Sequence, residues 1–181
     1  MITKDCKTVM YCAGLMTVLL LWFFVFAAEM SIFFLLRSVL LIILSYIAMV
    51  FDINTKRIPN ALVLVMIFGW LMLMALIILF NAENGLRFLS DSIFGLLTGG
   101  GLFLLIYVVS RKGLGGGDVK FMAAAGLYLG FAETVPAIFY GTLLAAVTGL
   151  ILFILKRLGR KDTFPLVPFL FIGIMITIFT K

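Results

Sequence analysis

Long apolar stretches, separated by short polar breaks, run through most of the chain. An α-helix needs about 20 predominantly apolar residues to cross roughly 30 Å of hydrocarbon. The pattern therefore predicts an all-α fold, a polytopic transmembrane helical bundle of about seven spans. The apolar stretches cover residues 10–29, 33–51, 61–80, 88–109, 119–131, 134–155 and 164–180.

The fifth stretch, residues 119–131, has 13 residues and makes only about 20 Å of helix, which is too short to span the hydrocarbon unaided. Either the helix starts in the preceding glycine run, residues 113–117, or it lies below the membrane surface. Non-helical backbone at that depth is tolerated only where it packs in protein or lines a water-filled cavity. An active site within the membrane requires such a setting.

Lysine and arginine are distributed unevenly between alternate loops, and in bilayer proteins the cytoplasmic loops carry the excess. The bias places the amino terminus and the loops 52–60, 110–120 and 156–163 in the cytoplasm. Arg37 falls on the outer side, where its side chain can snorkel to the interface, so we expect no function for it. The basic residues on the cytoplasmic side are Lys4, Lys7, Lys56, Arg57, Arg111, Lys112, Lys120, Lys156, Arg157, Arg160 and Lys161, against Arg37, Arg87 and Lys181 outside.

The composition agrees with a membrane setting, because only 12% of the residues are charged, whereas soluble proteins carry about 25%. We expect one membrane-embedded domain over residues 1–181, with an extra amino-terminal helix, 1–32, and a core, 33–181. We expect it in the inner, cytoplasmic membrane. The net charge of +6 follows the topology of the loops and does not indicate a nucleic-acid partner.

Histidine is absent from the sequence, which excludes Ser/His and Cys/His catalysis and imidazole metal ligands. The two cysteines, Cys6 and Cys12, are too few for a four-thiolate zinc site. We therefore expect neither a metal nor a cofactor, and any chemistry must come from carboxylates, hydroxyls, thiols or amines.

Two aspartates lie where apolar stretches meet the predicted cytoplasmic side of the membrane. Asp52 comes after the apolar run 45–51, and Asp118 closes the run Gly-Leu-Gly-Gly-Gly-Asp. Two carboxylates a few ångströms apart cannot both ionise cheaply, so such a pair holds one proton. The ionised carboxylate then takes a proton from water and the protonated one polarises a scissile carbonyl, which hydrolyses a peptide without histidine or metal. The alternative is that Asp118 is an N-cap after a flexible glycine hinge and Asp52 a solvated residue at a helix end.

The glycines suggest two different uses. A substrate backbone can approach Asp118 closely where no Cβ obstructs it, as at Gly113, Gly115, Gly116 and Gly117. A phosphate-binding loop is not indicated, because Lys120 comes three residues after the last of these glycines and is followed by Phe121. A small-residue face for helix packing suits Gly95, Gly99 and Gly126.

At these residues the sequence resembles the type IV prepilin peptidase family and the related archaeal preflagellin peptidases. The family has an aspartate at a helix end followed by a basic-Ile-Pro-Asn stretch and then a Gly-x-Gly-Asp motif. Here the first motif is Asp52 with Arg57, Ile58, Pro59 and Asn60, and the second is Gly115, Gly116, Gly117 and Asp118 with Val119 and Lys120. The resemblance extends from about residue 38 to the end and includes a proline-rich segment, 164–169, similar to the family's final motif.

The resemblance implies an aspartic endopeptidase with Asp52 and Asp118 as its catalytic pair. Its substrates would be type IV prepilin-like precursors, cut at the cytoplasmic face between a short basic leader and an apolar helix. The implied partners are these precursors and membrane lipids. The large bacterial members carry a cysteine-rich zinc-binding domain between their first helices, whereas only residues 29–32 separate the first two apolar stretches here. We therefore predict a short form without N-methyltransferase activity.

The other motif residues are expected to support the pair. Lys120 and Arg57 are candidates for holding a leader carboxylate or tuning the aspartates, although a topological role is the alternative. Gly115 and Gly117 are expected to leave space beside Asp118, because glycine has no Cβ. We expect the next turn and helix cap to be set by Pro59 and Asn60.

Three rival functions remain from the sequence. The presenilin and signal peptide peptidase group shares Gly-x-Gly-Asp but has Tyr-Asp and Pro-Ala-Leu motifs, while this chain has Phe51 before Asp52 and no Pro-Ala-Leu. A membrane carrier or assembly factor could bind ions or protons at interfacial aspartates. A magnesium-dependent phosphotransferase would have Asp52 and Asp118 as its metal ligands. Apart from Asp162 there is no further carboxylate nearby, so the site would have few ligands for magnesium.

Overall fold

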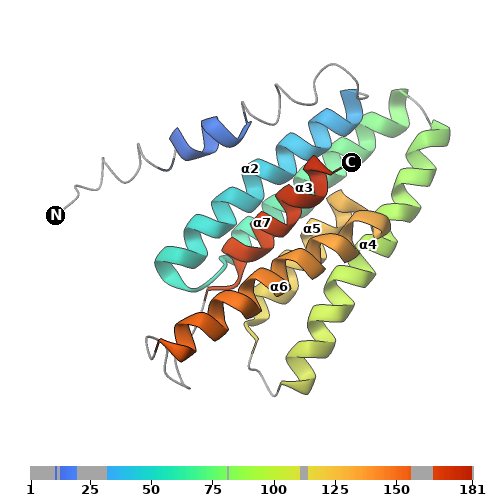
Figure 1. Cartoon of the computed structure of the whole chain (residues 1–181). Helices are drawn as coiled ribbons and strands as arrows, with labels where there is room; N and C mark the ends of the chain where they lie inside the picture. Colours follow the sequence, from blue (N-terminus) through green and yellow to red (C-terminus); the bar gives the residue numbers. More distant parts are fainter. Residues whose placement is uncertain are drawn as a thin grey trace.

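The computed structural model describes residues 11, 13–19, 32–80, 82–110, 114–155 and 165–180. Within these ranges the chain is all-helical and has no strand, which confirms the predicted fold class. Residues 13–19 are helical, and six longer helices follow (Figure 1). They are α2 (Ile32–Thr55), α3 (Asn60–Phe80), α4 (Ala82–Val109), α5 (Gly116–Leu129), α6 (Phe131–Ile154) and α7 (Val167–Phe179).

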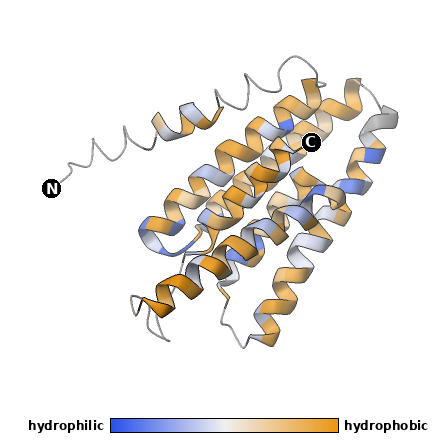
Figure 2. Cartoon of the chain, in the orientation of Figure 1, coloured by the Kyte–Doolittle hydropathy of each residue, from blue (hydrophilic) through white to orange (hydrophobic). Residues whose placement is uncertain are grey.

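Four of these helices are long and apolar enough to cross a membrane, and α7 is a shorter apolar helix. Figure 2 shows hydrophobic residues along most of the helical surface, with the most hydrophilic residues near helix ends. The first predicted span lies mostly outside the described residues, so the count of seven spans and the cytoplasmic amino terminus stay predictions. The predictions for Cys6, Cys12, Gly113 and the loop 156–163 also fall outside the described residues. The four long candidate spans are Ile32–Thr55, Asn60–Phe80, Gly85–Val109 and Phe131–Ile154.

The short helix α5 lies in the interior of the bundle, where it contacts α2, α3, α4 and α6. It starts at Gly116, which answers the question left by its length: the helix begins within the glycine run. Its 14 residues give about 21 Å of helix, less than the thickness of the hydrocarbon. Its residues 124–129 are continuously buried, so the protein, rather than lipid, surrounds this part of the chain.

Helices α4 and α5 approach closely because glycine faces glycine. A Cβ added to Gly95 would overlap the carbonyl oxygen of Gly126, and one added to Gly126 would overlap that of Gly95. A Cβ at Gly99 would lie 2.5 Å from the carbonyl oxygen of Met122. The predicted small-residue packing face is therefore confirmed, and it sets the position of α5 against the longer helix.

A single residue, Gly130, joins α5 to α6. Its φ of 76° lies in the left-handed region that favours glycine. The backbone N–H of Phe131, the first residue of α6, donates to Oδ1 of Asp91 at 2.9 Å, and a Cβ on Gly130 would overlap the same carboxylate. An aspartate of α4 thus caps the amino end of α6 and fixes where this tight turn lies.

The prediction that the Arg37 side chain snorkels to the interface is wrong. Arg37 is buried, and its Nη2 lies 3.3 Å from Oε2 of Glu133. The guanidinium carbon lies 5.0 Å from the ring centroid of Phe34 and 5.3 Å from that of Phe88, within cation–π range. The hydropathy pattern suggested a helix end here, but the charge stays inside because an acidic partner and two rings replace water.

The glycine contact between α4 and α5 gives a direct stability test. We expect Gly126→Ala to destabilise the protein by about 1–3 kcal/mol, since its Cβ meets backbone that cannot move aside. The matched control is Gly149→Ala in α6, where a Cβ meets nothing within 4 Å, and we expect it to be neutral or stabilising by up to about 1 kcal/mol. Thermal unfolding in detergent compares the two variants; equal midpoints would contradict the close packing.

Candidate active site

Asp52 lies in the last turn of α2 and is buried. The backbone N–H of Val167, the first residue of α7, donates to its Oδ2 at 3.0 Å. The N–H of Leu166, the N-cap residue of α7, also donates to the Asp52 carboxylate. The alternative of a solvated residue at a helix end is right about the helix end but wrong about the solvation, because the Asp52 side chain is buried and turns inward to the amino end of α7.

The first motif shapes the turn after Asp52. Helix α2 ends at Thr55, and Lys56 takes a left-handed φ of 52°, as residues just beyond a helix commonly do. The carbonyl oxygen of Pro59 then accepts the N–H of Leu62 at 3.0 Å, and α3 begins at Asn60. This tight connection brings the start of α3 beside the end of α2, next to the buried carboxylate.

Asp118 is the third residue of α5, and its carboxylate reaches back to the N–H of Gly115, the N-cap residue. A Cβ on Gly115 would lie 2.8 Å from Oδ2 of Asp118, so a side chain at this position would displace the carboxylate. The alternative of Asp118 as the N-cap is wrong by position, because Gly115 takes that place. The arrangement corresponds to one half of a capping box.

The two aspartates interact electrostatically although 66 residues separate them (118 minus 52). Burial, and after it the negative charge of Asp52, raise the pKa of Asp118 to about 6, while the Gly115 N–H acts in the opposite direction. Helices α2 and α5 are in contact, and a Cβ on Gly117 would lie 3.3 Å from the Cβ of Ile58 in the connection after α2. The structure thus brings the two sequence motifs together at one end of the bundle.

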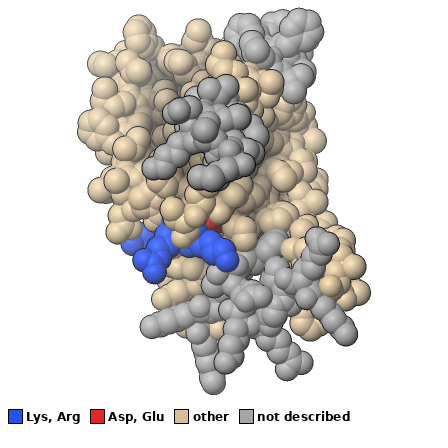
Figure 3. All heavy atoms as spheres, turned by 90° about the vertical axis from the view of Figure 1, so that its left-hand side faces the viewer, with Lys and Arg blue, Asp and Glu red and all other residues tan. Residues whose placement is uncertain are grey.

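Exposed basic side chains surround this end of the molecule. Lys56, Arg57 and Lys120 are exposed, and Nζ of Lys120 donates to Oδ1 of Asn60 at 3.0 Å. Figure 3 shows basic side chains gathered in one area of the surface, with a small acidic area beside them. Burial and the Asp52 charge raise the pKa of Asp118, so Lys120 is not needed to explain the shift.

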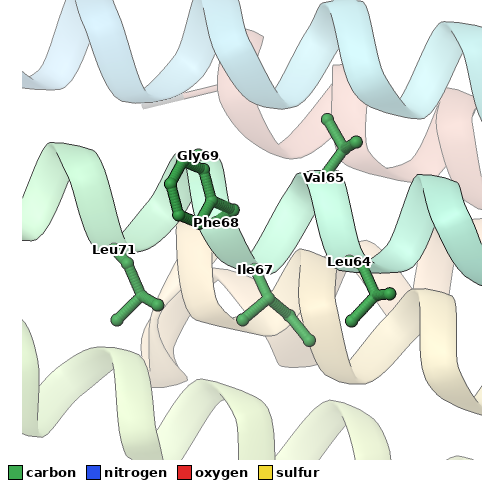
Figure 4. Close-up of a pocket in the computed structure, with 6 residues that line it drawn as sticks. All are labelled: Leu64, Val65, Ile67, Phe68, Gly69 and Leu71. Carbon is green, nitrogen blue, oxygen red and sulfur yellow. The ribbon is translucent and has the colours of Figure 1, made fainter.

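An apolar depression elsewhere on the surface is separate from the aspartates. It is lined by residues of α3 alone, and Leu64, Ile67 and Leu71 project from the same side of that helix (Figure 4). These side chains are exposed on a helix long enough to cross a membrane, so we assign this surface to lipid contact. Among the described residues, no three Asp, Glu, Cys or His side chains gather in one place.

Comparison with known protein families identifies the family of the chain. The model of the type IV leader peptidase family matches residues 38–154, which is more than half of the sequence and includes both aspartates. The chain belongs to the type IV leader peptidase family. This is a family of aspartic-type proteases, and the resemblance inferred from the two motifs is confirmed.

Curated relatives in the type IV leader peptidase family carry the name prepilin leader peptidase/N-methyltransferase. The one from Escherichia coli (strain K12) is 34% identical over 137 residues, covering 71% of this chain and 56% of the relative. Those from Pectobacterium carotovorum subsp. carotovorum and Aeromonas hydrophila are 35% and 27% identical, each over 67% of this chain and over 42% and 41% of the relative. The chain therefore spans about half the length of the curated relatives that it matches. No solved structure matches the chain.

The sequence did not reveal every contact of this family's candidate site. The proline-rich segment 164–169 was noted as a motif, but not as the source of the N–H groups that meet Asp52. Backbone donors leave no mark in the side-chain pattern, because any residue except proline supplies one. The contact between α2 and α7 also joins residues 115 positions apart, beyond the reach of local periodicity.

Gly115 provides a test of how the candidate site is built. We expect Gly115→Ala to displace the Asp118 carboxylate, because the new Cβ would lie 2.8 Å from Oδ2, and to cost about 1–3 kcal/mol of stability. The adjacent variant Gly116→Ala adds a Cβ with nothing within 4 Å and should unfold at or above the wild-type temperature. Thermal unfolding of both variants measures this difference; a Gly115→Ala protein as stable as Gly116→Ala would contradict the described contact.

Proposed function

We propose that this protein is a membrane aspartic endopeptidase that removes the short basic leader from type IV prepilin-like precursors at the cytoplasmic face of the inner membrane. The observation that carries the proposal is the electrostatic interaction of Asp52 and Asp118 at one end of the bundle. Burial and the Asp52 charge hold the pKa of Asp118 at about 6, a value at which one proton can be kept and donated near neutral pH.

The proposed reaction uses a pair that shares one proton. The ionised carboxylate takes a proton from water as the water oxygen bonds to the scissile carbonyl carbon, and the protonated carboxyl group gives its proton to the carbonyl oxygen. The resulting diol then collapses. The C–N bond breaks, the leaving nitrogen receives the proton taken from water, and a diol hydroxyl returns a proton to the second aspartate. The pair ends in its starting state, with no covalent intermediate.

The nature of the substrate follows from the family and from the position of the pair. Relatives are named prepilin leader peptidase/N-methyltransferase, and we extend the peptidase part of that name to this chain. A precursor with its apolar helix in the bilayer presents the leader junction at the membrane boundary, where α2 ends and α5 begins. We propose that N-methyltransferase activity is absent, because only residues 29–32 separate the first two apolar stretches.

Loss of either aspartate should abolish cleavage. We expect Asp52→Asn and Asp118→Asn to lower the cleavage rate of co-expressed pilin-like precursors by roughly a hundred- to ten-thousandfold, the contribution of general acid–base catalysis. The matched control is Asp91→Asn, since Asp91 also meets a helix amino end and an asparagine can still accept that hydrogen bond. Membrane levels of all variants are compared by immunoblot. Cleavage that survives in both dyad variants would favour the alternative of a carrier or assembly factor.

The proposed reaction also fixes a pH dependence. The acid must be protonated to donate, so kcat/KM should fall about tenfold for each pH unit once the pH rises through the Asp118 pKa, which is about 6. The measurement is cleavage of a detergent-solubilised precursor across the pH range, with thermal unfolding followed in the same buffers. A rate that stays level well above neutral pH while the protein remains folded would show that Asp118 is not the proton donor.

A further inference from the structure

The amino-terminal turn of α7 supplies an unusual set of donors to Asp52. Its residues are Pro165, Leu166, Val167 and Pro168, and the two prolines have no N–H. The turn therefore contains two backbone N–H groups, those of Leu166 and Val167, and both donate to the Asp52 carboxylate. Both backbone donors within residues 165–168 thus meet one side chain.

The N–H groups of this turn stabilise the ionised form of a carboxylate. The first N–H groups of a helix have no partner within it and carry a partial positive charge. Asp52 itself lies in the last turn of α2, where the unpaired carbonyl groups disfavour an anion. The amino end of α7 therefore compensates for an unfavourable position, and proline at the second position of α7 fixes the backbone that carries the donors.

Asp118 has a different environment. It receives the N–H of Gly115 from its own helix, and burial is the largest influence on it. The Asp52 charge also acts on the Asp118 carboxyl group. Burial acts on both carboxyl groups, so what distinguishes them is the donors: Asp52 meets the amino end of another helix, whereas Asp118 meets a single N–H of its own helix. A difference of this kind can assign the base and the acid of a pair.

We propose that the Leu166–Val167 turn of α7 is a positioning element that divides the work of the pair, holding Asp52 as the base that takes the proton from water and leaving Asp118 as the acid. This inference rests on the proposed peptidase function and deepens it. Leu166 and Val167 do not touch substrate; they act through Asp52. The family match ends at residue 154, before this turn.

An amide-to-ester replacement tests the role of the Val167 N–H without changing a side chain. Val167 is replaced by α-hydroxyvaline during cell-free synthesis into liposomes, which exchanges the N–H for an ester oxygen. We expect kcat to fall roughly ten- to a hundredfold, the effect of one hydrogen bond to a charged group, with KM unchanged. The acid side of the pH profile should move to higher pH, because a carboxylate that loses a donor binds its proton more tightly.

The matched control is the same replacement at Phe169. Its N–H donates to the carbonyl oxygen of Leu166 at 3.1 Å, so the ester removes one hydrogen bond from the same turn but none from Asp52. We expect this control to keep the wild-type pH profile. If the two esters change kcat and the acid side of the profile equally, the turn is only structural and the inference is wrong. Failure of the wild-type protein to cleave would instead reject the proposed function.

Infrared spectroscopy tests the division of roles without turnover. In wild-type protein held slightly below pH 6, Asp118 should contribute the absorption band of a protonated carboxyl group, since its pKa is about 6. We expect Asp118→Asn to remove that band. Asp52→Asn should keep the band but move its titration to lower pH, because the Asp52 charge that raises the Asp118 pKa is lost. The band disappearing in Asp52→Asn and persisting in Asp118→Asn would assign the acid to the other aspartate and overturn the inference, even where the ester variants fail to fold.

Discussion

The hydrogen bond between an aspartate carboxylate and the amino end of a helix recurs throughout the described part of this bundle. Asp118 meets the amino end of α5, Asp91 that of α6, and Asp52 that of α7. Free N–H groups at helix starts need partners where water is scarce, and a chain with 12% charged residues has few to offer. The Asp91 and Asp52 contacts fix where α6 and α7 begin relative to α4 and α2, whereas the Asp118 contact lies within the start of α5 itself.

The two ends of the bundle balance their buried charge in different ways. At one end Arg37 pairs with Glu133 and interacts with Asp91, so positive and negative charge largely offset each other. At the other end Asp52 is buried and Asp118 half-buried, while the basic residues there are exposed. The same kind of helix cap is therefore structural where a buried cation accompanies it. Where a second carboxylate lies nearby instead, the capping aspartate can take part in proton transfer, because one of the two carboxyl groups then retains a proton.

Much of this arrangement followed from the sequence, and the exceptions have a common physical cause. Apolar stretches predicted the helices, and glycine spacing predicted the α4–α5 contact. The exposure of two charged residues was misjudged: one alternative took Asp52 as solvated at its helix end, and Arg37 was expected to reach the interface, but both are buried. A hydropathy pattern places every charged residue in contact with water. Here both charged side chains have partners distant in the sequence: the Val167 N–H donates to Asp52, and Glu133 pairs with Arg37.

Under the proposed function, the charge around the candidate site also limits how a basic leader binds. Lys56, Arg57 and Lys120 are exposed and repel a basic peptide, so attraction for the leader has to come from the aspartate pair, which keeps one negative charge while it holds one proton. The exposed basic residues suit the anionic headgroups of the cytoplasmic leaflet instead. In this arrangement the residues that fix the depth of the protein in the membrane differ from those that draw in the leader. The negative charge that the α7 turn stabilises on Asp52 then serves both substrate attraction and proton transfer.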